Sequence, residues 1–424
     1  MKIDPKTLTT LGVHLHGRQI GTIVRLAGDR QIFSFDQSYI DDPQRPTLSL
    51  SFKGRSGGLV TAPQQVRQRV PTFFANLLPE GHLRSYLAEQ AGVHPQREFF
   101  LLAALGADLS GAVMVTPLGH GVDDGGHDEH HDDDNEDENQ KDKQGSGRRL
   151  RFSLAGVQLK FSAIMEARGG LTVPAEGIGG SWIVKLPSHT FDAVSENEFV
   201  MLELARAIGI AVPRIHLVPV SEIQGLPFLG AAIKGTALAV ERFDRMPDGG
   251  RVHMEDFAQV FGQFPEDKYK AVSYANIARV LWAETGAQGA YEFIRRLTFS
   301  VLIGNADMHL KNWSLLYPDT RTPVLSPAYD FVSTLPYIPG DKLALTLGGS
   351  RDLEQISLDQ IRRLTEKAGM PMDPVVRIVH DTAEATIEAW RHLPAQDLLP
   401  AAIKTVIDNQ ITTAAHTTLI AKRG

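Results

Sequence analysis

The sequence of 424 residues contains no cysteine. A chain without cysteine has no disulfide framework and no thiolate for catalysis or metal binding. It also has no apolar run near the roughly 20 residues that a membrane-spanning helix needs. The first fifteen residues lack the basic segment and apolar core of a signal peptide. These absences predict a cytoplasmic protein that does not associate with membranes.

Charge of one sign is concentrated in a single segment. Eleven of the 50 acidic residues and two of the 43 basic residues lie between His120 and Gln144, so the rest of the chain carries a net charge near +2. This balance provides no strongly basic surface of the kind that autonomous binding to nucleic acid requires. The hydrophobic share of 42% and the charged share of 22% are typical of a soluble globular protein.

The acidic segment, residues 119–149, has almost no apolar side chains and is bounded by glycines. Such a sequence cannot bury enough surface to order itself, which predicts a disordered linker or loop. Histidines among carboxylates can bind divalent metal weakly, but we assign no metal site to them; they are His120, His127, His130 and His131. The segment either alters the docking of a partner or is a spacer. Deleting residues 120–144 and measuring partner affinity and activity would separate these two hypotheses.

The remaining sequence divides into three regions, which is consistent with roughly 150 residues per domain. Residues 1–118 combine short alternating runs with a helical stretch at residues 73–92, which predicts a β-rich domain that carries helices. Residues 150–245 read as strand, helix and strand, and residues 246–424 read as mostly helical. The predicted fold class is α+β, with a β-rich lobe joined to a helical lobe.

The helix expected after residue 194 has marked ends. Ser195 and Glu198 have the spacing of a capping box, and Gly209 followed by Pro213 marks the end of the helix. Just before this helix, the apolar run WIVKLP predicts a strand with one cation, Lys185.

The window IGNADMHLKNWSLL predicts a catalytic loop. Asp307 and Asn312 lie five residues apart after a helix whose last turn ends at Gly304, and Asp330 follows at an expected strand end. Phosphoryl transfer needs an Asp that accepts the proton of the attacking hydroxyl, and an Asn and a second Asp that hold magnesium. Protein kinases have this order and spacing. The alternative is that both residue types simply favour loops.

Lys185 strengthens the kinase interpretation because buried lysine is rare unless it is paired. In a kinase, the lysine of this strand grips the α- and β-phosphates of ATP, and its order relative to the catalytic and metal-binding Asp agrees with this chain. The alternative is an edge-strand lysine with its amine in water.

Glu198 could pair with Lys185, as in kinases, but we favour the role in the capping box. In VERFDR, backbone groups of Glu241 and Phe243 could bind an adenine edge, although a plain strand exit is also possible.

Six ordered motifs resemble the HipA family of serine/threonine kinase toxins. They are SLAGVQLK (residues 153–160), IVKLP, ENEF, VERFDR, GNADMHLKN and PAYDF. The upstream FFANLLPEG resembles the N-terminal domain of the same family. The chain lacks the usual glycine-rich phosphate loop of protein kinases, and Gly156 is the only glycine in the corresponding window. The resemblance implies a two-lobed, protein-kinase-like (HipA-like) fold behind the β-rich N-terminal domain, with a mostly helical C-terminal lobe.

The resemblance also assigns roles to residues. It implies that Asp307 is the catalytic base, that Asn312 and Asp330 bind Mg²⁺, and that Ser153 is autophosphorylated. A phosphate on Ser153 would add negative charge to a loop that must approach ATP, which opposes the active conformation. The ATP-binding residues implied by the resemblance are Ala155, Gly156, Val157, Gln158, Leu159, Lys160, Lys185, Glu241, Arg242, Phe243, His309, Leu310, Lys311, Asn312, Tyr329 and Asp330.

The family implies partners as well. HipA-like proteins pair with a small helix-turn-helix antitoxin (HipB-like), which supplies most of the DNA contact, and an aminoacyl-tRNA synthetase is the best-known substrate. We therefore expect an ATP- and Mg²⁺-dependent serine/threonine protein kinase that acts as the toxin of a toxin-antitoxin pair. The alternatives are a catalytically silent, kinase-shaped corepressor that acts with the antitoxin, and a small-molecule kinase. Labelled ATP distinguishes them, since only a protein kinase would modify its own Ser153.

Overall fold

A computed structural model describes residues 8–118, 160–165, 171–173, 179–226, 233–270 and 272–415. The acidic segment 119–149 lies outside these residues, so the prediction of disorder there remains a prediction. No helix in the described ranges is long and apolar enough to cross a membrane.

The N-terminal part, residues 8–118, is built on a five-stranded antiparallel sheet in the order β4-β3-β2-β1-β5. Its strands combine buried residues, such as Leu11, Val13 and Phe33, with more exposed ones, as expected for a sheet with one face on a core. The strands are β1 Thr10–Leu15, β2 Arg18–Leu26, β3 Arg30–Phe35, β4 Gln64–Arg67 and β5 Val113–Leu118, and the helices are α1 Gln37–Ile40, α2 Thr72–Ala75, α3 Gly81–Gln90 and α4 Glu98–Leu105.

The middle part, residues 160–241, contains a six-stranded sheet in the order β10-β7-β6-β8-β11-β9. Only β10 and β7 pair in parallel. Helix α5 packs on β11 and β9 of this sheet. The elements are β6 Lys160–Met165, β7 Leu171–Thr172, β8 Trp182–Lys185, α5 Val194–Ala207, β9 Ile215–Pro219, β10 Ile223–Gln224 and β11 Thr236–Glu241.

The C-terminal part is mainly helical, as predicted, but it also contains small sheets that the sequence pattern did not indicate. One sheet has the order β12-β13-β14, and β15 pairs with β16. The strands are β12 His253–Asp256, β13 Ser314–Tyr317, β14 Val324–Leu325, β15 Lys342–Leu347 and β16 Ser350–Asp352. The helices are α6 Phe257–Val260, α7 Tyr274–Glu284, α8 Gly286–Leu302, α9 Leu358–Ala368, α10 Met372–His392 and α11 Ala401–Thr413.

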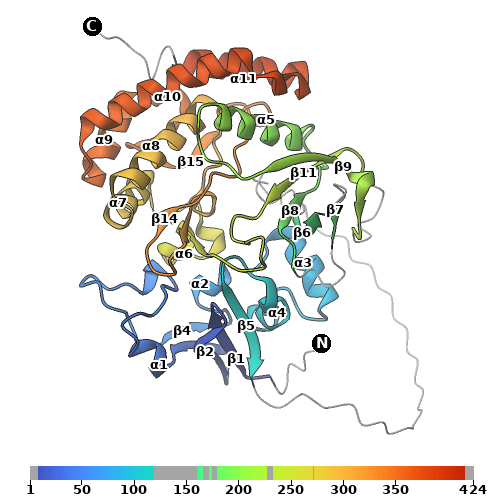
Figure 1. The fold of residues 1–424 in the computed structure, drawn as a ribbon, viewed down its shortest axis with the longest axis vertical. Coiled ribbons are helices and arrows are strands. Elements are labelled where there is room, and N and C mark those ends of the chain that lie inside the picture. Colours follow the sequence, from blue (N-terminus) through green and yellow to red (C-terminus); the bar gives the residue numbers. More distant parts are fainter. Residues whose placement is uncertain are drawn as a thin grey trace, which may run out of the picture.

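Three hydrophobic clusters correspond to these parts. One lies under the N-terminal sheet, one lies within the middle sheet, and the largest joins α5 to the C-terminal helices. Figure 1 shows the N-terminal part at the lower end of the molecule, with α9, α10 and α11 at the opposite end and the middle sheet on the right. Helix α3 of the N-terminal part approaches the middle sheet, where Tyr86 and Phe161 pack edge to face. Ser49 Oγ of the N-terminal part also donates to Glu255 Oε2 of β12 at 2.5 Å. The N-terminal part therefore contacts both of the other parts.

Candidate active site

The loop that carries Asp307 begins where α8 ends. Gly304 has φ of +67° and Asn305 donates its N–H to the Ser300 carbonyl at 2.8 Å, which forms a C-terminal helix cap. A Cβ at Gly304 would lie 2.6 Å from Leu335 Cδ1. Both the left-handed backbone and the close packing therefore require glycine here, and the predicted helix end is confirmed.

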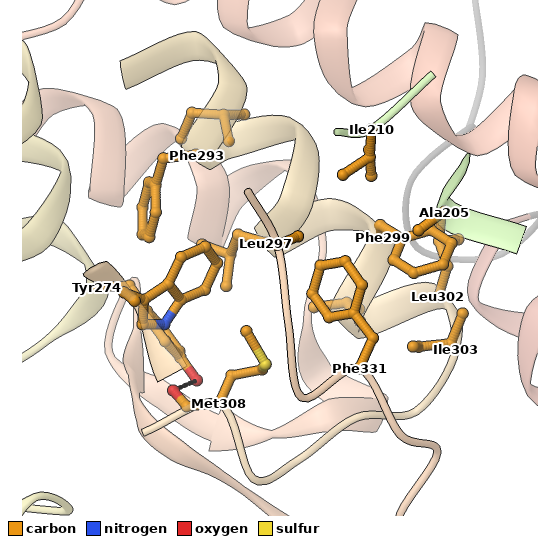
Figure 2. Close-up of a cluster of buried hydrophobic side chains, with 14 of the residues drawn as sticks. Ala205, Ile210, Tyr274, Phe293, Leu297, Phe299, Leu302, Ile303, Met308 and Phe331 are labelled. Atoms are coloured by element: carbon orange, nitrogen blue, oxygen red, sulfur yellow. Dashed lines mark hydrogen bonds between the residues drawn. The ribbon is translucent and has the colours of Figure 1, made fainter. Parts of the chain in front are cut away.

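Hydrophobic neighbours anchor the two acidic motifs to the core. Figure 2 shows Met308 and Phe331, which adjoin Asp307 and Asp330 in sequence, pointing into a buried cluster around α8. The Tyr274 hydroxyl also donates to the Met308 carbonyl at 3.0 Å. This packing positions the backbone from which both carboxylates project.

Asp307 is held by a residue that sequence analysis did not single out. The hydroxyl of Tyr269 donates to Asp307 Oδ1 at 2.8 Å. Burial raises the pKa of Asp307 to about 6, while the Tyr269 hydrogen bond and the charge of Lys268 oppose this rise. A carboxylate with a raised pKa in a protected site is suited to accept a proton from a substrate hydroxyl.

Two asparagines connect the acidic motifs. Asn305 accepts the Asp307 N–H at 3.2 Å and donates from Nδ2 to the Asp330 carbonyl at 3.2 Å. Asn312 donates from Nδ2 to the Asp307 carbonyl at 2.9 Å. Within the described part of the chain, no hydrogen bond uses Asn312 Oδ1. The predicted residues Asp307, Asn312 and Asp330 are therefore brought together, and the oxygen of Asn312 remains available for a ligand.

Asp330 lies in an irregular loop, so the expected strand end is wrong. The last strand before it, β14, ends at Leu325. Asp330 has φ of +56°, a left-handed conformation that Asp tolerates better than most residues. Its carboxylate contacts Lys185 Nζ and lies 3.8 Å from Lys160 Nζ. Burial opposes ionisation, but the two lysines hold the pKa of Asp330 well below its usual range.

Lys185 joins three separate elements. It projects from β8, an interior strand, and its side chain is only 7% exposed, so the alternative of an edge-strand lysine in water is wrong. Its Nζ donates to Glu198 Oε1 of α5 at 2.5 Å and to Asp330 Oδ1. Burial alone would lower the pKa of Lys185, but the two carboxylates reverse this and raise it. Lys185 is therefore a protonated cation between two carboxylates.

The favoured role of Glu198 in a capping box is also wrong. Helix α5 begins one residue earlier than predicted, after Ala193 with φ of +50°, and no side chain caps it. Glu198 instead turns toward Lys185. Burial and the charge of Asp330 raise the pKa of Glu198 even though Lys185 counteracts them. The predicted end of the helix is confirmed, because Gly209 has φ of +81°.

The VERFDR segment leaves β11 at the junction of the parts. The N–H groups of Glu241 and Arg242 already donate to the carbonyls of Arg214 and Ser181, both at 2.8 Å. The Arg242 side chain is buried in ion pairs with Asp244 and Asp108. Its guanidinium therefore links the strand exit to the N-terminal part. Among the described residues, no hydrogen bond uses the N–H of Phe243.

The ring of Phe243 lies 5.7 Å from that of Tyr329, between ring centroids. The Tyr329 hydroxyl donates to the Lys311 carbonyl at 2.9 Å and shares a hydrogen bond of 2.5 Å with Ser314 Oγ. Two aromatic rings thus lie where the strand exit meets the PAYDF motif. The two ring planes are tilted by 40° to each other, and the pair provides apolar surface beside Lys311 and Asp330.

The residues between Asp307 and Asn312 differ in orientation. His309 is buried, neither ring nitrogen has a hydrogen-bond partner among the described residues, and its ring packs edge-on against Tyr269. Burial, together with Lys268, keeps the pKa of His309 well below its usual range, so the ring is neutral. Leu310 is fully buried in the core. Lys311 points toward the N-terminal part, where its Nζ donates to the Asn76 carbonyl at 2.9 Å.

The predicted phosphate loop is described only at its end. Lys160 opens β6 and faces Asp330. Ser153 and residues 155–159 lie outside the described residues, so their assignments stay predictions.

The chemistry of these donors fits magnesium. Mg²⁺ prefers hard oxygen ligands and is usually bound by one or two carboxylates together with phosphate oxygens. Asp330 supplies an ionised carboxylate and Asn312 an unused amide oxygen. The described ranges contain no cluster of three or more His, Asp or Glu side chains that would hold a metal by itself. The arrangement therefore matches a metal that arrives with a phosphate ligand.

Comparison with known families supports the same interpretation. Residues 152–390 match the profile of the HipA-like C-terminal domain, and residues 11–116 match that of the HipA N-terminal domain. These two matches cover most of the residues outside the acidic segment. All the residues discussed above for the site lie within them.

Similar proteins include "Putative kinase Y4dM" of Sinorhizobium fredii, which is 50% identical over 91% of both chains. The "Serine/threonine-protein kinase toxin HipA" of Shewanella oneidensis is 27% identical over 92% of both chains. A chain in the structure of the Shewanella oneidensis HipA, HipB and operator DNA complex superposes with a TM-score of 0.73 at 22% identity, covering 96% of this chain and 97% of that one. The superposition confirms the α+β, HipA-like kinase fold that the sequence predicts.

Proposed function

The chain belongs to the HipA family, and from that premise we propose that it is an ATP- and Mg²⁺-dependent serine/threonine protein kinase. The observation that carries the proposal is the position of Lys185, which contacts Glu198 and Asp330 at once. These residues come from β8, α5 and the loop after β14. A scaffold without catalytic function has no evident need for a buried lysine shared by two carboxylates, since a buried ion pair is often no more stable than apolar packing.

Each residue has a role in transfer of the γ-phosphoryl group. Asp307 accepts the proton from the hydroxyl of the acceptor serine or threonine at its carboxylate, while Tyr269 keeps that carboxylate oriented through Oδ1. Lys185 holds phosphate oxygens in line, and Glu198 keeps its amine in place. Catalysis then comes mainly from positioning and fixed charge, as is usual for phosphoryl transfer.

Asn312 and Asp330 are the proposed magnesium ligands. When bound there, the metal would neutralise negative charge on the phosphate oxygens. Lys160 and Lys185 lower the pKa of Asp330 and so keep its carboxylate ionised. The carboxylate is therefore ready to bind a cation at neutral pH.

The adenine would lie between the strand exit and the aromatic pair. Among the described residues, no hydrogen bond uses the N–H of Phe243, which leaves this donor for the base. The rings of Phe243 and Tyr329 offer apolar surface beside it. The backbone of Glu241 and the remaining motif residues, including His309, complete the proposed ATP site.

We further propose the toxin role that relatives of this family carry in their names. A helix-turn-helix antitoxin would be the partner, in keeping with the HipA, HipB and operator DNA complex whose fold this chain shares. DNA contact would come mainly through that antitoxin. An aminoacyl-tRNA synthetase is the proposed substrate class, Ser153 the proposed autophosphorylation site, and the cytoplasm, where ATP is available, the proposed compartment.

The direct test is incubation with γ-labelled ATP and magnesium, followed by mass spectrometry of phosphopeptides. The variant Asp307→Asn removes the general base, which typically contributes about 10² to 10⁴ in rate. Asp319→Asn is the matched control, because Asp319 caps an exposed turn through the N–H groups of Arg321 and Thr322.

We expect phosphate on Ser153 of the wild type and of the control, and none on the Asp307→Asn variant. Incorporation that is equal in all three proteins would refute Asp307 as the base. No incorporation and no magnesium-dependent ATP binding in the wild type would refute the kinase function and leave a corepressor scaffold. Transfer to a small-molecule acceptor with an unmodified chain would favour a small-molecule kinase.

A further inference from the structure

The N-terminal part reaches the catalytic loop through one carboxylate, Glu80. This residue caps no helix end with its side chain, although it immediately precedes α3. Its Oε2 lies 2.9 Å from Lys268 Nζ, and its Oε1 lies 3.7 Å from Lys311 Nζ. One carboxylate of the N-terminal part therefore lies between two lysines of the C-terminal part.

Both lysines belong to segments that shape the catalytic loop. Lys311 immediately precedes Asn312, the proposed metal ligand. The carbonyl of Lys268 accepts the N–H of Leu310 at 3.3 Å. The residue after Lys268 is Tyr269, whose hydroxyl holds the Asp307 carboxylate. A shift of either lysine would therefore move a group that contacts Asp307 or Asn312.

The two lysines are also deeply buried, so they depend on their partners. The side chain of Lys268 is 9% exposed and that of Lys311 is 16% exposed. Lys311 contacts Asp256 at 3.0 Å as well, but Glu80 is the only ion-pair partner of Lys268 among the described residues. Burial opposes ionisation of Glu80, yet Lys311 and Lys268 hold the pKa of Glu80 below its usual range. A buried charge that loses its partner carries a large penalty.

Asn76, four residues before Glu80, contributes to the same contact between the N-terminal part and Lys311. Asn76 donates from Nδ2 to the Gln263 carbonyl at 2.7 Å, and Lys311 donates to both the carbonyl and Oδ1 of Asn76. The segment from Asn76 to Glu80 thus contacts the catalytic loop and the segment that leads to Tyr269. Ser49 makes another polar contact between these parts, with Glu255 on β12, and this contact includes no residue of the segment 305–313.

We propose that Glu80 is a positioning residue for phosphoryl transfer, and that the N-terminal part thereby completes the active site. The proposal rests on the kinase function proposed above. Glu80 does not contact the reacting groups itself. It acts by holding Lys268 and Lys311, and through them Tyr269, Asp307 and Asn312. A purely architectural contact would instead affect only how firmly the N-terminal part is attached.

The test compares Glu80→Gln with Ser49→Ala in the full-length protein. The first variant removes the charge that holds the two lysines, and the second removes a hydrogen bond between the same two parts that does not reach the loop. Steady-state transfer from ATP is measured at saturating magnesium. A small misplacement of a catalytic group can lower the rate by about 10²-fold. We expect the kcat of Glu80→Gln to fall at least about tenfold, with the KM for ATP within about twofold of wild type, and Ser49→Ala to match the wild type.

A second readout does not depend on activity. Amide hydrogen exchange of the peptide that spans residues 305–313 reports how firmly the loop is held. We expect faster exchange in Glu80→Gln than in the wild type, and no change in Ser49→Ala. If the wild type transfers no phosphate, the kinase proposal fails, and this exchange measurement still decides whether Glu80 positions the loop.

Lys268→Gln provides a check from the other end of the contact. If Glu80 acts through Lys268, the losses of the two single variants should not multiply in the double variant. The proposal is overturned if Glu80→Gln keeps the wild-type kcat or the wild-type loop exchange. It is also overturned if Ser49→Ala slows transfer as much as Glu80→Gln, because the effect would then belong to the attachment of the N-terminal part in general.

Discussion

Replacing Glu255 by Gln should remove a pH dependence of stability that originates between the N-terminal and C-terminal parts. Glu255 is fully buried on β12 and accepts hydrogen bonds from Ser49 Oγ at 2.5 Å, from the Leu50 N–H at 3.0 Å and from the Tyr317 hydroxyl. Burial raises the pKa of Glu255 from 4.5 to about 7, although these three donors favour the charged form. The folded protein therefore binds this proton more tightly than the unfolded chain does.

The sign and the size of the effect follow from that difference. A raised pKa in the folded state contributes stability that is fully present below about pH 4.5 and is lost as the pH rises through about 7. At 1.36 kcal/mol per pKa unit, the loss is at most about 3 kcal/mol. The Gln side chain keeps an oxygen for Leu50 and Tyr317 and presents an amide to the Ser49 hydroxyl, so it resembles the protonated carboxyl.

Urea unfolding of both proteins between pH 5 and pH 8 measures this prediction. The free energy of unfolding of Glu255→Gln should increase relative to the wild type as the pH rises, by up to about 3 kcal/mol. Glu284→Gln is the control for removing a negative charge at the same contact, because Glu284 pairs with Lys53 near the surface, and its offset from the wild type should stay constant. A constant offset for Glu255→Gln as well would refute the argument that burial outweighs the three donors.

Two further substitutions test Lys185 and Tyr269, which contact the proposed metal ligand and the proposed base. Lys185→Met leaves the buried carboxylates of Glu198 and Asp330 without their shared cation, so phosphate transfer should be lost and the free energy of unfolding should fall by about 3 to 5 kcal/mol; unchanged urea midpoints would contradict this. Tyr269→Phe removes the hydroxyl that holds the Asp307 carboxylate and should lower kcat about tenfold. Tyr39→Phe, which loses a hydrogen bond to the Pro46 carbonyl within the N-terminal part, should lower stability by about 1 kcal/mol and leave kcat within about twofold. Equal kcat losses in the two tyrosine variants would show that the hydroxyl on the carboxylate has no special role.

Local patterns predicted the elements of the site well because the relevant signals lie within a few residues. A strand of apolar residues around Lys185 and a helix that stops at Gly304 can both be recognised from adjacent side chains. The order of Asp307, Asn312 and Asp330 along the chain also indicated the phosphoryl-transfer chemistry that we propose. The structure then added the distances, which no local pattern contains.

Glu198 shows where local reasoning fails. The spacing of Ser195 and Glu198 satisfies the rule for a capping box, and within a single helix that is the most favourable use of the carboxylate. In the folded chain, Lys185 is buried beside Glu198 and would lack a partner without it. Neutralising a buried charge is worth more than a helix cap of about 1 kcal/mol, so the tertiary contact prevails.

The contacts of Tyr269 and Glu80 could not be predicted from the sequence, for a different reason. Glu80 is separated from Lys268 by 188 residues and its motif contains no partner charge. Tyr269 lies 38 residues before Asp307, in a segment without a regular pattern. Such pairs become visible only when the fold brings distant segments together, which is why contacts between distant residues are harder to predict than residues within one motif.

The charges around Lys185 give a reason to expect that the proposed nucleotide binds together with a divalent cation. The charges of Lys160 and Lys185 are balanced by those of Glu198 and Asp330, so this cluster, in which only Lys160 is substantially exposed, is close to neutral. A triphosphate that entered alone would compete with both carboxylates for the same two amines and would leave uncompensated negative charge in a site of low dielectric. If the Lys185 amine turned toward the phosphates, Asp330 would lose the positive charge of its ion pair. Magnesium at Asp330 would replace that charge. ATP affinity should therefore depend steeply on magnesium, and a titration that showed equal ATP affinity with and without the metal would refute this reasoning.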